Sequence, residues 1–89
     1  MTPLQHEINA ASTALLARAD GLRVHASATR NGVNATALDA LEWSAALRAD
    51  LDELDGLLVH QARVEGATWE LVGEAMNMTK QGAHQRWGS

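Results

Sequence analysis

Apolar residues in the first third of the chain follow a helical stripe. They recur every three or four positions, at Leu4, Ile8, Ala11, Leu15 and Leu22. A helix start precedes the stripe, because Thr2 can cap, Pro3 suits the first helical position and Gln5 can reach back to the cap. Gly21 weakens this helix locally but need not end it.

A second stripe follows a turn. Arg30–Asn34 contains asparagine and glycine, which tolerate backbone angles that other residues avoid. The next helix is predicted to begin near Thr36, which with Asp39 forms a pair similar to a capping box. It is predicted to stop at Gly66. Its apolar positions are Leu41, Ala45, Leu47, Leu51, Leu54, Leu58 and Ala62.

Two helices of roughly 28 residues, each about 40 Å long, are expected to pack as antiparallel neighbours. Four apolar residues lie off their shared seam: Leu16, Trp43, Leu57 and Val59. A homodimer that forms a four-helix bundle would cover them, and so small a core favours that arrangement. The alternative is that two short C-terminal helices cover them within one chain.

Residues 67–87 contain the signals of two short helices. Thr68 can cap the first, and Glu70 lies in its positive first turn. Its predicted inward residues are Val72, Ala75 and Met76. Gly73 leaves room for another helix to pass closely.

The second short helix follows a tight turn. Asn77 is a residue type that accepts the left-handed conformation, and Met78 is expected to be buried in the turn. Thr79 caps the next helix, on which Ala83 and Trp87 face inward. This spacing predicts a helix-turn-helix. The expected fold is therefore all-α, with a long antiparallel hairpin at 1–66, whose second helix also supports the helix-turn-helix at 67–89.

The same segment resembles the trihelical helix-turn-helix superfamily, which includes region 4 of sigma factors. It is most similar to the C-terminal part of small actinobacterial-type regulators. The matching residues are Ala67, Thr68, Trp69, Val72, Gly73, Ala75, Met76, Thr79, Lys80, Gln81, Ala83, His84, Gln85, Arg86 and Trp87. The chain departs from that pattern at Asn77, where glycine is usual, and at Gly82, where alanine is common.

This resemblance implies a DNA-binding regulator whose second short helix enters the major groove of double-stranded DNA. Carried onto this sequence, the candidate DNA contacts are Thr68, Thr79, Lys80, Gln81, His84, Gln85 and Arg86. Lys80 suits guanine, and Gln81 or Gln85 suits adenine. Arg86 and Thr68 are assigned to phosphate. The alternative for these polar residues is an ordinary solvated helix face, and Trp69 and Trp87 are interpreted as core.

The charge balance supports a second hypothesis. The net charge is −4, so any DNA footprint is small, although two bases, Lys80 and Arg86, fall in the last helix. The second hypothesis is an adaptor or anti-regulator that binds a protein partner through its acidic hairpin. A cluster of acidic residues is interpreted as a solvent-exposed face of the second helix, with a partner-binding surface as the minority interpretation. The cluster consists of Asp50, Asp52, Glu53 and Asp55.

Composition argues against other classes of function. The chain has no cysteine, and its four histidines lack metal-site spacing, so no metal or cofactor is expected. No nucleophile with a base and no phosphate-cradling loop is recognisable, so an enzyme is not expected. The sequence contains neither a signal peptide nor a membrane span, which predicts a soluble cytoplasmic protein without membrane contact.

Overall fold

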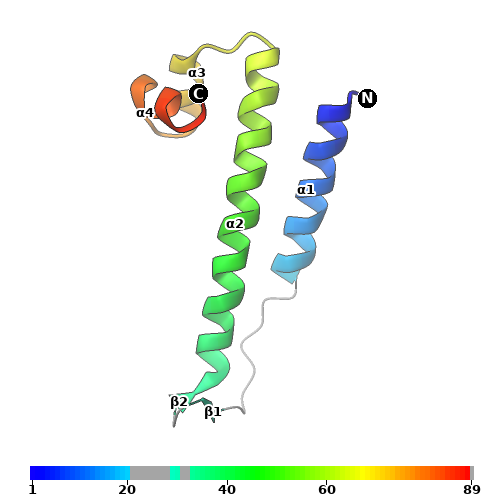
Figure 1. Cartoon of the computed structure of the whole chain (residues 1–89), viewed down its shortest axis with the longest axis vertical. Coiled ribbons are helices and arrows are strands. Elements are labelled where there is room, and N and C mark those ends of the chain that lie inside the picture. The colour runs from blue at the N-terminus through cyan, green and yellow to red at the C-terminus, as the bar shows by residue number, and fades with distance from the viewer. Residues whose placement is uncertain (21–28, 31–32, 89) are drawn as a thin grey trace.

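Helices dominate the computed structural model, which describes residues 1–20, 29–30 and 33–88. Its elements are α1 (Pro3–Asp20), β1 (Thr29–Arg30), β2 (Val33–Asn34), α2 (Ala35–Val64), α3 (Trp69–Ala75) and α4 (Lys80–Trp87). Helices α1 and α2 run antiparallel and pack together, and the short pair α3 and α4 lies beside the C-terminal end of α2 (Figure 1). The predicted all-α hairpin with a C-terminal pair of short helices is confirmed.

Helix α1 begins as its sequence indicates. The backbone N–H of Thr2 donates to Gln5 Oε1 at 2.8 Å, and the N–H of Gln5 donates to Thr2 Oγ1 at 3.1 Å. The described part of the helix has 18 residues and runs to Asp20. The expected continuation through Gly21 to Leu22 lies outside the described residues.

The turn predicted at Arg30–Asn34 is flanked by a short antiparallel ladder. Thr29 pairs with Asn34, and Arg30 pairs with Val33. Residues 31 and 32 lie outside the described residues. The pairing reverses the chain direction, which is what an antiparallel hairpin of α1 and α2 requires.

Helix α2 is the longest of the described helices. It has 30 residues, and Gly66 follows it with a φ of 98°, the left-handed geometry predicted for the residue past a helix end. Near its N-terminal half, the Trp43 indole N–H donates to the carbonyl oxygen of Arg18, and the Arg18 guanidinium pairs with Asp50. Trp43 therefore packs at the seam between α1 and α2, whereas the apolar spacing had predicted that it lies off that seam.

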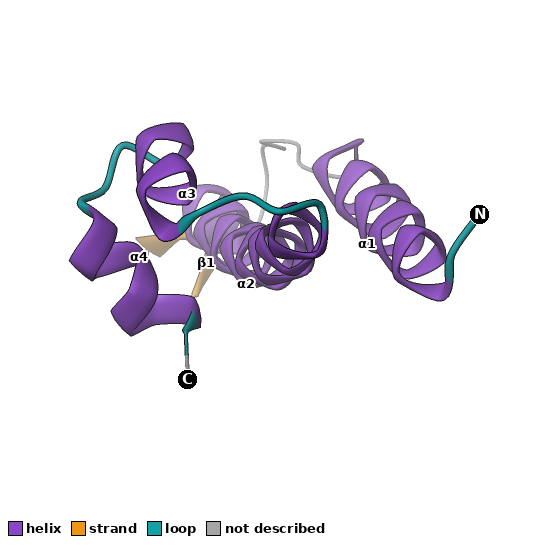
Figure 2. Cartoon of the chain, turned by 90° about the horizontal axis from the view of Figure 1, so that it is seen from above, coloured by secondary structure: helices purple, strands orange, loops and turns teal. Residues whose placement is uncertain are grey.

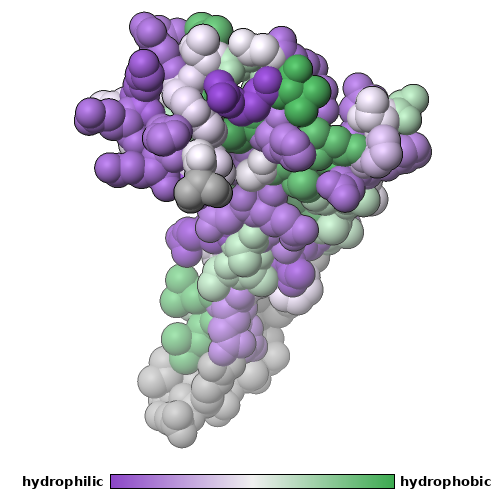
Figure 3. Space-filling model, turned by 45° about the horizontal axis from the view of Figure 1, so that its top comes forward, coloured by the Kyte–Doolittle hydropathy of each residue, from purple (hydrophilic) through white to green (hydrophobic). Residues whose placement is uncertain are grey.

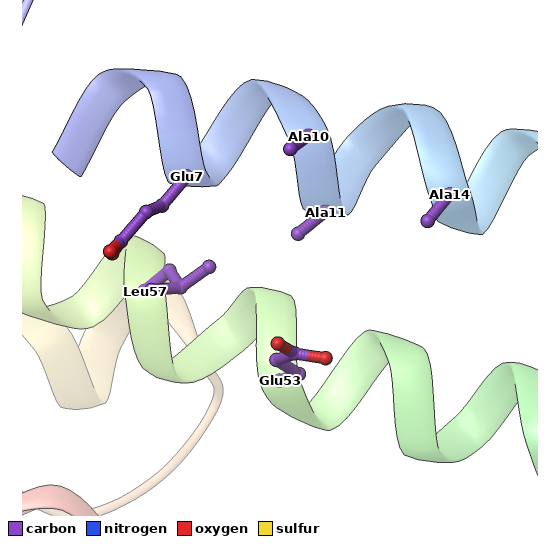
Figure 4. Close-up of a pocket in the computed structure, with 6 residues that line it drawn as sticks. All are labelled: Glu7, Ala10, Ala11, Ala14, Glu53 and Leu57. Atoms are coloured by element: carbon purple, nitrogen blue, oxygen red, sulfur yellow. The ribbon is translucent and has the colours of Figure 1, made fainter. Parts of the chain in front are cut away.

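The seam between α1 and α2 is loosely filled. Figure 4 shows Leu57 of α2 pointing towards α1, where the facing residues are alanines, with Glu7 reaching towards the same turn of α2. The resulting open groove of about 490 Å³ is lined by Glu7, Ala10, Ala11, Ala14, Glu53 and Leu57. It holds only two carboxylates, and no group of three potential metal ligands occurs among the described residues.

The small core lies where α2 meets the two short helices. Val59, Val72 and Ala83 are buried, and Ala67, Trp69 and Trp87 pack against them. Val59 is thus covered within one chain, as the alternative to dimerisation proposed, whereas Leu16 remains 70% exposed. None of the described helices is long and apolar enough to cross a membrane.

Candidate nucleic-acid interface

Helix α3 begins at the predicted cap. The Thr68 hydroxyl accepts a hydrogen bond from the N–H of Leu71 at 3.2 Å, and Glu70 occupies the first turn. Val72 faces inward and is 4% exposed, and Met76 is half-buried. Ala75 is exposed rather than inward, because it lies at the rim of an apolar groove instead of in the core.

The turn after α3 depends on two residues. Asn77 has a φ of 56°, the left-handed conformation predicted for it. Gly73 is buried, and a Cβ built on it would lie 2.7 Å from the carbonyl oxygen of Met78. The backbone of the turn therefore passes directly over Gly73, and the N–H of Met78 donates to the Gly73 carbonyl at 2.8 Å. The Met78 side chain is half-buried.

Helix α4 is anchored from beneath. The Thr79 hydroxyl accepts from the N–H of Gly82 at 3.0 Å and caps the helix. Ala83 is fully buried, and Trp87, one turn later, is half-buried against the same core. The inward face predicted for this helix is confirmed.

The opposite side of α4 is polar and open. Each residue of an α-helix is rotated by about 100° from the last, so Gln81 and Gln85 lie on the crest away from Ala83. Lys80 and His84 occupy one flank of that crest. All four side chains are exposed, as are those of Thr68 and Thr79. In the end-on view of Figure 2, α4 lies at the outer edge of the molecule, on the side of α2 away from α1.

His84 has a defined position on this face. Its ring meets the ring of Trp69 edge-on, with centroids 5.4 Å apart and planes at 69°. Trp69 is a partly buried residue of α3, so the contact ties the exposed face of α4 to the helix before it. The imidazole remains exposed enough to reach a ligand in front of α4.

Arg86 lies on the other flank and contacts the chain's own body. Its guanidinium donates to Asp52 Oδ1 at 3.0 Å and stacks over Trp87 at 4.8 Å. Both charged side chains are substantially exposed, so the pair contributes little to stability. Arg86 can reach a phosphate only by leaving Asp52.

Arg63 is a positioning residue that the sequence interpretation did not assign. Its guanidinium stacks over Trp69 at 4.5 Å and donates to the Ala67 carbonyl at 2.8 Å. It therefore fixes the connection between α2 and α3. The available signal was its position in the last turn of α2, where a cation can bond carbonyl groups beyond the helix end.

The acidic residues Asp50–Asp55 of α2 do not form one solvent-exposed face, contrary to the interpretation from sequence. Asp50 pairs with Arg18 of α1, and Asp52 pairs with Arg86 of α4. Glu53 lines the groove beside α1, and Asp55 lines a different groove beside α3. The charges therefore point around the helix, and this dispersal weakens the adaptor hypothesis.

No protein-family model, no curated protein and no solved structure matches the chain.

Proposed function

We propose that this chain is a small homodimeric transcriptional regulator that binds double-stranded DNA and reads the major groove with α4. The observation that carries the proposal is the two-sidedness of this helix. Ala83 and Trp87 hold it from beneath, while Lys80, Gln81 and Gln85 face outward without burial. The turn before it, with Asn77 left-handed and Gly73 closely covered, supports a helix-turn-helix as the carrier.

The polar side chains of the crest and of the Lys80–His84 flank suit base edges. The Lys80 ammonium can donate to O6 and N7 of guanine, and the amides of Gln81 and Gln85 can pair with N6 and N7 of adenine. His84 can donate to a base acceptor or to a phosphate. These residues occupy the first six positions of α4, and N-terminal residues of a recognition helix are those that reach bases.

The remaining candidates suit the DNA backbone. The exposed hydroxyls of Thr68 and Thr79 accept backbone N–H groups in the free chain and keep their own protons available for phosphate oxygens. Arg86 can add a further phosphate contact once it leaves Asp52. Such contacts set the register of the protein and carry no sequence information themselves.

The charge of the chain predicts modest binding by one copy. With a net charge of −4 and few cations near α4, affinity should depend only shallowly on salt. A homodimer doubles the contacts. If two recognition helices meet one face of DNA, their half-sites lie about 34 Å apart and form an imperfect palindrome. The proposal includes a cytoplasmic location, which suits a chain without cysteine.

The experiment is selection of bound sequences from a pool of random duplexes with the full chain, followed by titration of the selected site. We expect enrichment of one motif. The double variant Lys80→Ala, Gln81→Ala should lose specific binding, because it removes one side chain of the crest and one of its flank, while its thermal stability stays near that of the native chain. Retained affinity for the selected site would reject the role of α4.

A glutamine elsewhere supplies the matched control. Gln61 lies on α2 and donates to Glu65 at 3.0 Å, away from α4. Gln61→Ala should leave both affinity and sequence preference unchanged. If this control weakens binding as much as Gln81→Ala does, the effect of Gln81→Ala does not report on a base contact.

A further inference from the structure

An exposed leucine stripe runs along α2 on the side that neither α1 nor α3 covers fully. Its members are Leu47, Leu51, Leu54 and Leu58. Their spacing of four, three and four residues averages about 3.7, which keeps them on one face of α2, as in a helix that packs against another helix along its length. Leu51 and Leu58 are each 45% exposed, and Leu47 and Leu54 are half-buried. Figure 3 shows hydrophobic side chains gathered between the α3–α4 end and α1.

An apolar groove adjoins this leucine stripe. It lies between α2 and α3, has a volume of about 280 Å³, and is lined by Asp55, Leu58, Val59, Ala62, Val72, Ala75 and Met76. Leu58 belongs to both the stripe and the groove. Only Asp55 places a charge in the lining, so a hydrophobic side chain is the occupant that the groove suits.

We infer that the occupant of this surface is α2 of a second copy of this chain, packed antiparallel along the leucine stripe. The stripe is then self-complementary: Leu51 faces the second copy's Leu54, and Leu47 faces its Leu58, about a two-fold axis near residues 52 and 53. In the core of the seam this register follows from the sequence spacing alone, because an antiparallel two-fold pairs positions whose numbers have a constant sum. Positions on the flank of the stripe meet with an offset of two residues from that register, about 3 Å along the axis.

Charge selects this direction. Arg48 and Asp55 occupy the same flank of the stripe, seven residues apart. In the antiparallel pair Arg48 of one copy lies beside Asp55 of the other, and the two-fold axis repeats this contact. Neither has an ion-pair partner among the described side chains. A parallel pairing would instead bring Asp50 of one copy towards Asp55 of the other, and like charges at flanking positions oppose association.

The same register fills the groove. Leu41 lies on this flank one heptad before Arg48 and is 64% exposed, beyond the part of α2 that α1 accompanies. In the antiparallel pair it lies opposite Ala62 of the second copy, which lines the groove. This contact covers both the most exposed leucine of α2 and the apolar groove. Because the dimer is two-fold symmetric, the contact occurs twice.

This arrangement also orients the two ends of the molecule. Helix α1 and the α3–α4 pair lie on opposite sides of α2 in the end-on view (Figure 2). A two-fold axis perpendicular to α2 therefore puts both α3–α4 pairs on one face of the dimer and both α1 helices on the other. The seam itself does not rest on DNA binding, and its test contains no DNA, so either proposal can fail alone.

The first arm of the test measures the mass of the full chain in solution by sedimentation equilibrium. We expect a dimer, and we expect Leu51→Glu to raise its Kd by at least about tenfold, since the charge enters the centre of the seam. Leu16→Glu is the matched control, because Leu16 is 70% exposed but lies on α1. A monomeric native chain, or a dimer broken only by Leu16→Glu, overturns the inference.

The second arm tests direction by charge. In the antiparallel register Asp55→Arg faces Arg48 and weakens the dimer, and adding Arg48→Glu restores it. In a parallel register Asp55→Arg faces Asp50 and strengthens the dimer. Circular dichroism of each variant verifies that the helices persist, so a loss of association is separated from a loss of fold.

The third arm uses the absence of native cysteine. Mixed Leu41→Cys and Ala62→Cys chains should form a disulfide between different chains upon oxidation. In a parallel pair these positions are about 30 Å apart along the axis, and only self-linked Leu41→Cys or Ala62→Cys dimers form. Self-linking without the mixed product overturns the antiparallel assignment.

Discussion

At the residue scale, the turn between α3 and α4 depends on the absence of a side chain at one position and on a tolerant backbone at another. Gly73 is covered by the carbonyl oxygen of Met78, so the turn would have to move to admit even a methyl group. Asn77 adopts a φ of 56°, which most residues avoid because Cβ approaches the following carbonyl. The orientation of α4 therefore rests on backbone contacts of α3.

Gly73 and Gly56 give a sharp prediction, because the same substitution at these two helical glycines should have opposite effects. Gly73→Ala should destabilise the fold by about 1–3 kcal/mol through overpacking against the turn. Gly56, inside α2, has no heavy atom within 4 Å of a built Cβ. Gly56→Ala should therefore stabilise the chain by about 0.5–1 kcal/mol. Thermal or urea unfolding measures both, and an equal sign for the two variants would contradict the packing described here.

At the element scale, α2 organises the molecule by offering different sides to different neighbours. Asp50 and Leu57 meet α1, and Val59 meets the short helices. The leucine stripe lies between these contacts. Two of the four residues predicted to lie off the seam, Trp43 and Leu57, face α1 instead, so that prediction was wrong for them. Val59 is buried against the short helices and Leu16 is exposed, whereas Leu51 and Leu58 of the predicted seam stripe remain exposed.

Local signals predicted the elements well. The cap at Thr79, the left-handed Asn77 and the buried Ala83 could all be predicted because each depends on its immediate neighbours in sequence. The ion pairs of Asp50 and Asp52 could not, because their partners lie more than 30 residues away and depend on how helices pack. The same reason explains why one acidic run was mistaken for one face.

The Arg86–Asp52 pair links two elements and allows a second prediction. Asp52→Asn should release Arg86 towards phosphate, raise DNA affinity a few-fold at low salt, and increase the salt slope by about one contact. Stability should change by less than about 1 kcal/mol, since the pair is exposed. Titrations of the selected duplex at several salt concentrations measure the slope.

Glu53→Gln is the control for that prediction. It removes one negative charge from the same helix, but Glu53 lines the groove beside α1 and does not contact Arg86. A purely long-range effect of charge would make the two variants alike. Equal salt slopes for Asp52→Asn and Glu53→Gln would show that Arg86 does not bind phosphate.

At the scale of the whole molecule, a chain of net charge −4 carries a polar helix face at one corner of an elongated body. The acidic residues that oppose DNA lie mainly along α2, and two of them are neutralised by arginines of the same chain. The exposed crest of α4 lies on the far side of the core from α2. Pairing two chains would present two such crests and raise affinity without changing the charge of either face.

The most direct test of the account is nuclear magnetic resonance of the ¹⁵N-labelled full chain, titrated with the selected duplex. The backbone signals of residues 79–85 and the side-chain amides of Gln81 and Gln85 should shift most, and a duplex of unrelated sequence should shift them less. Perturbations centred on α1 or on the acidic residues of α2, with α4 unmoved, would contradict recognition of DNA by this helix.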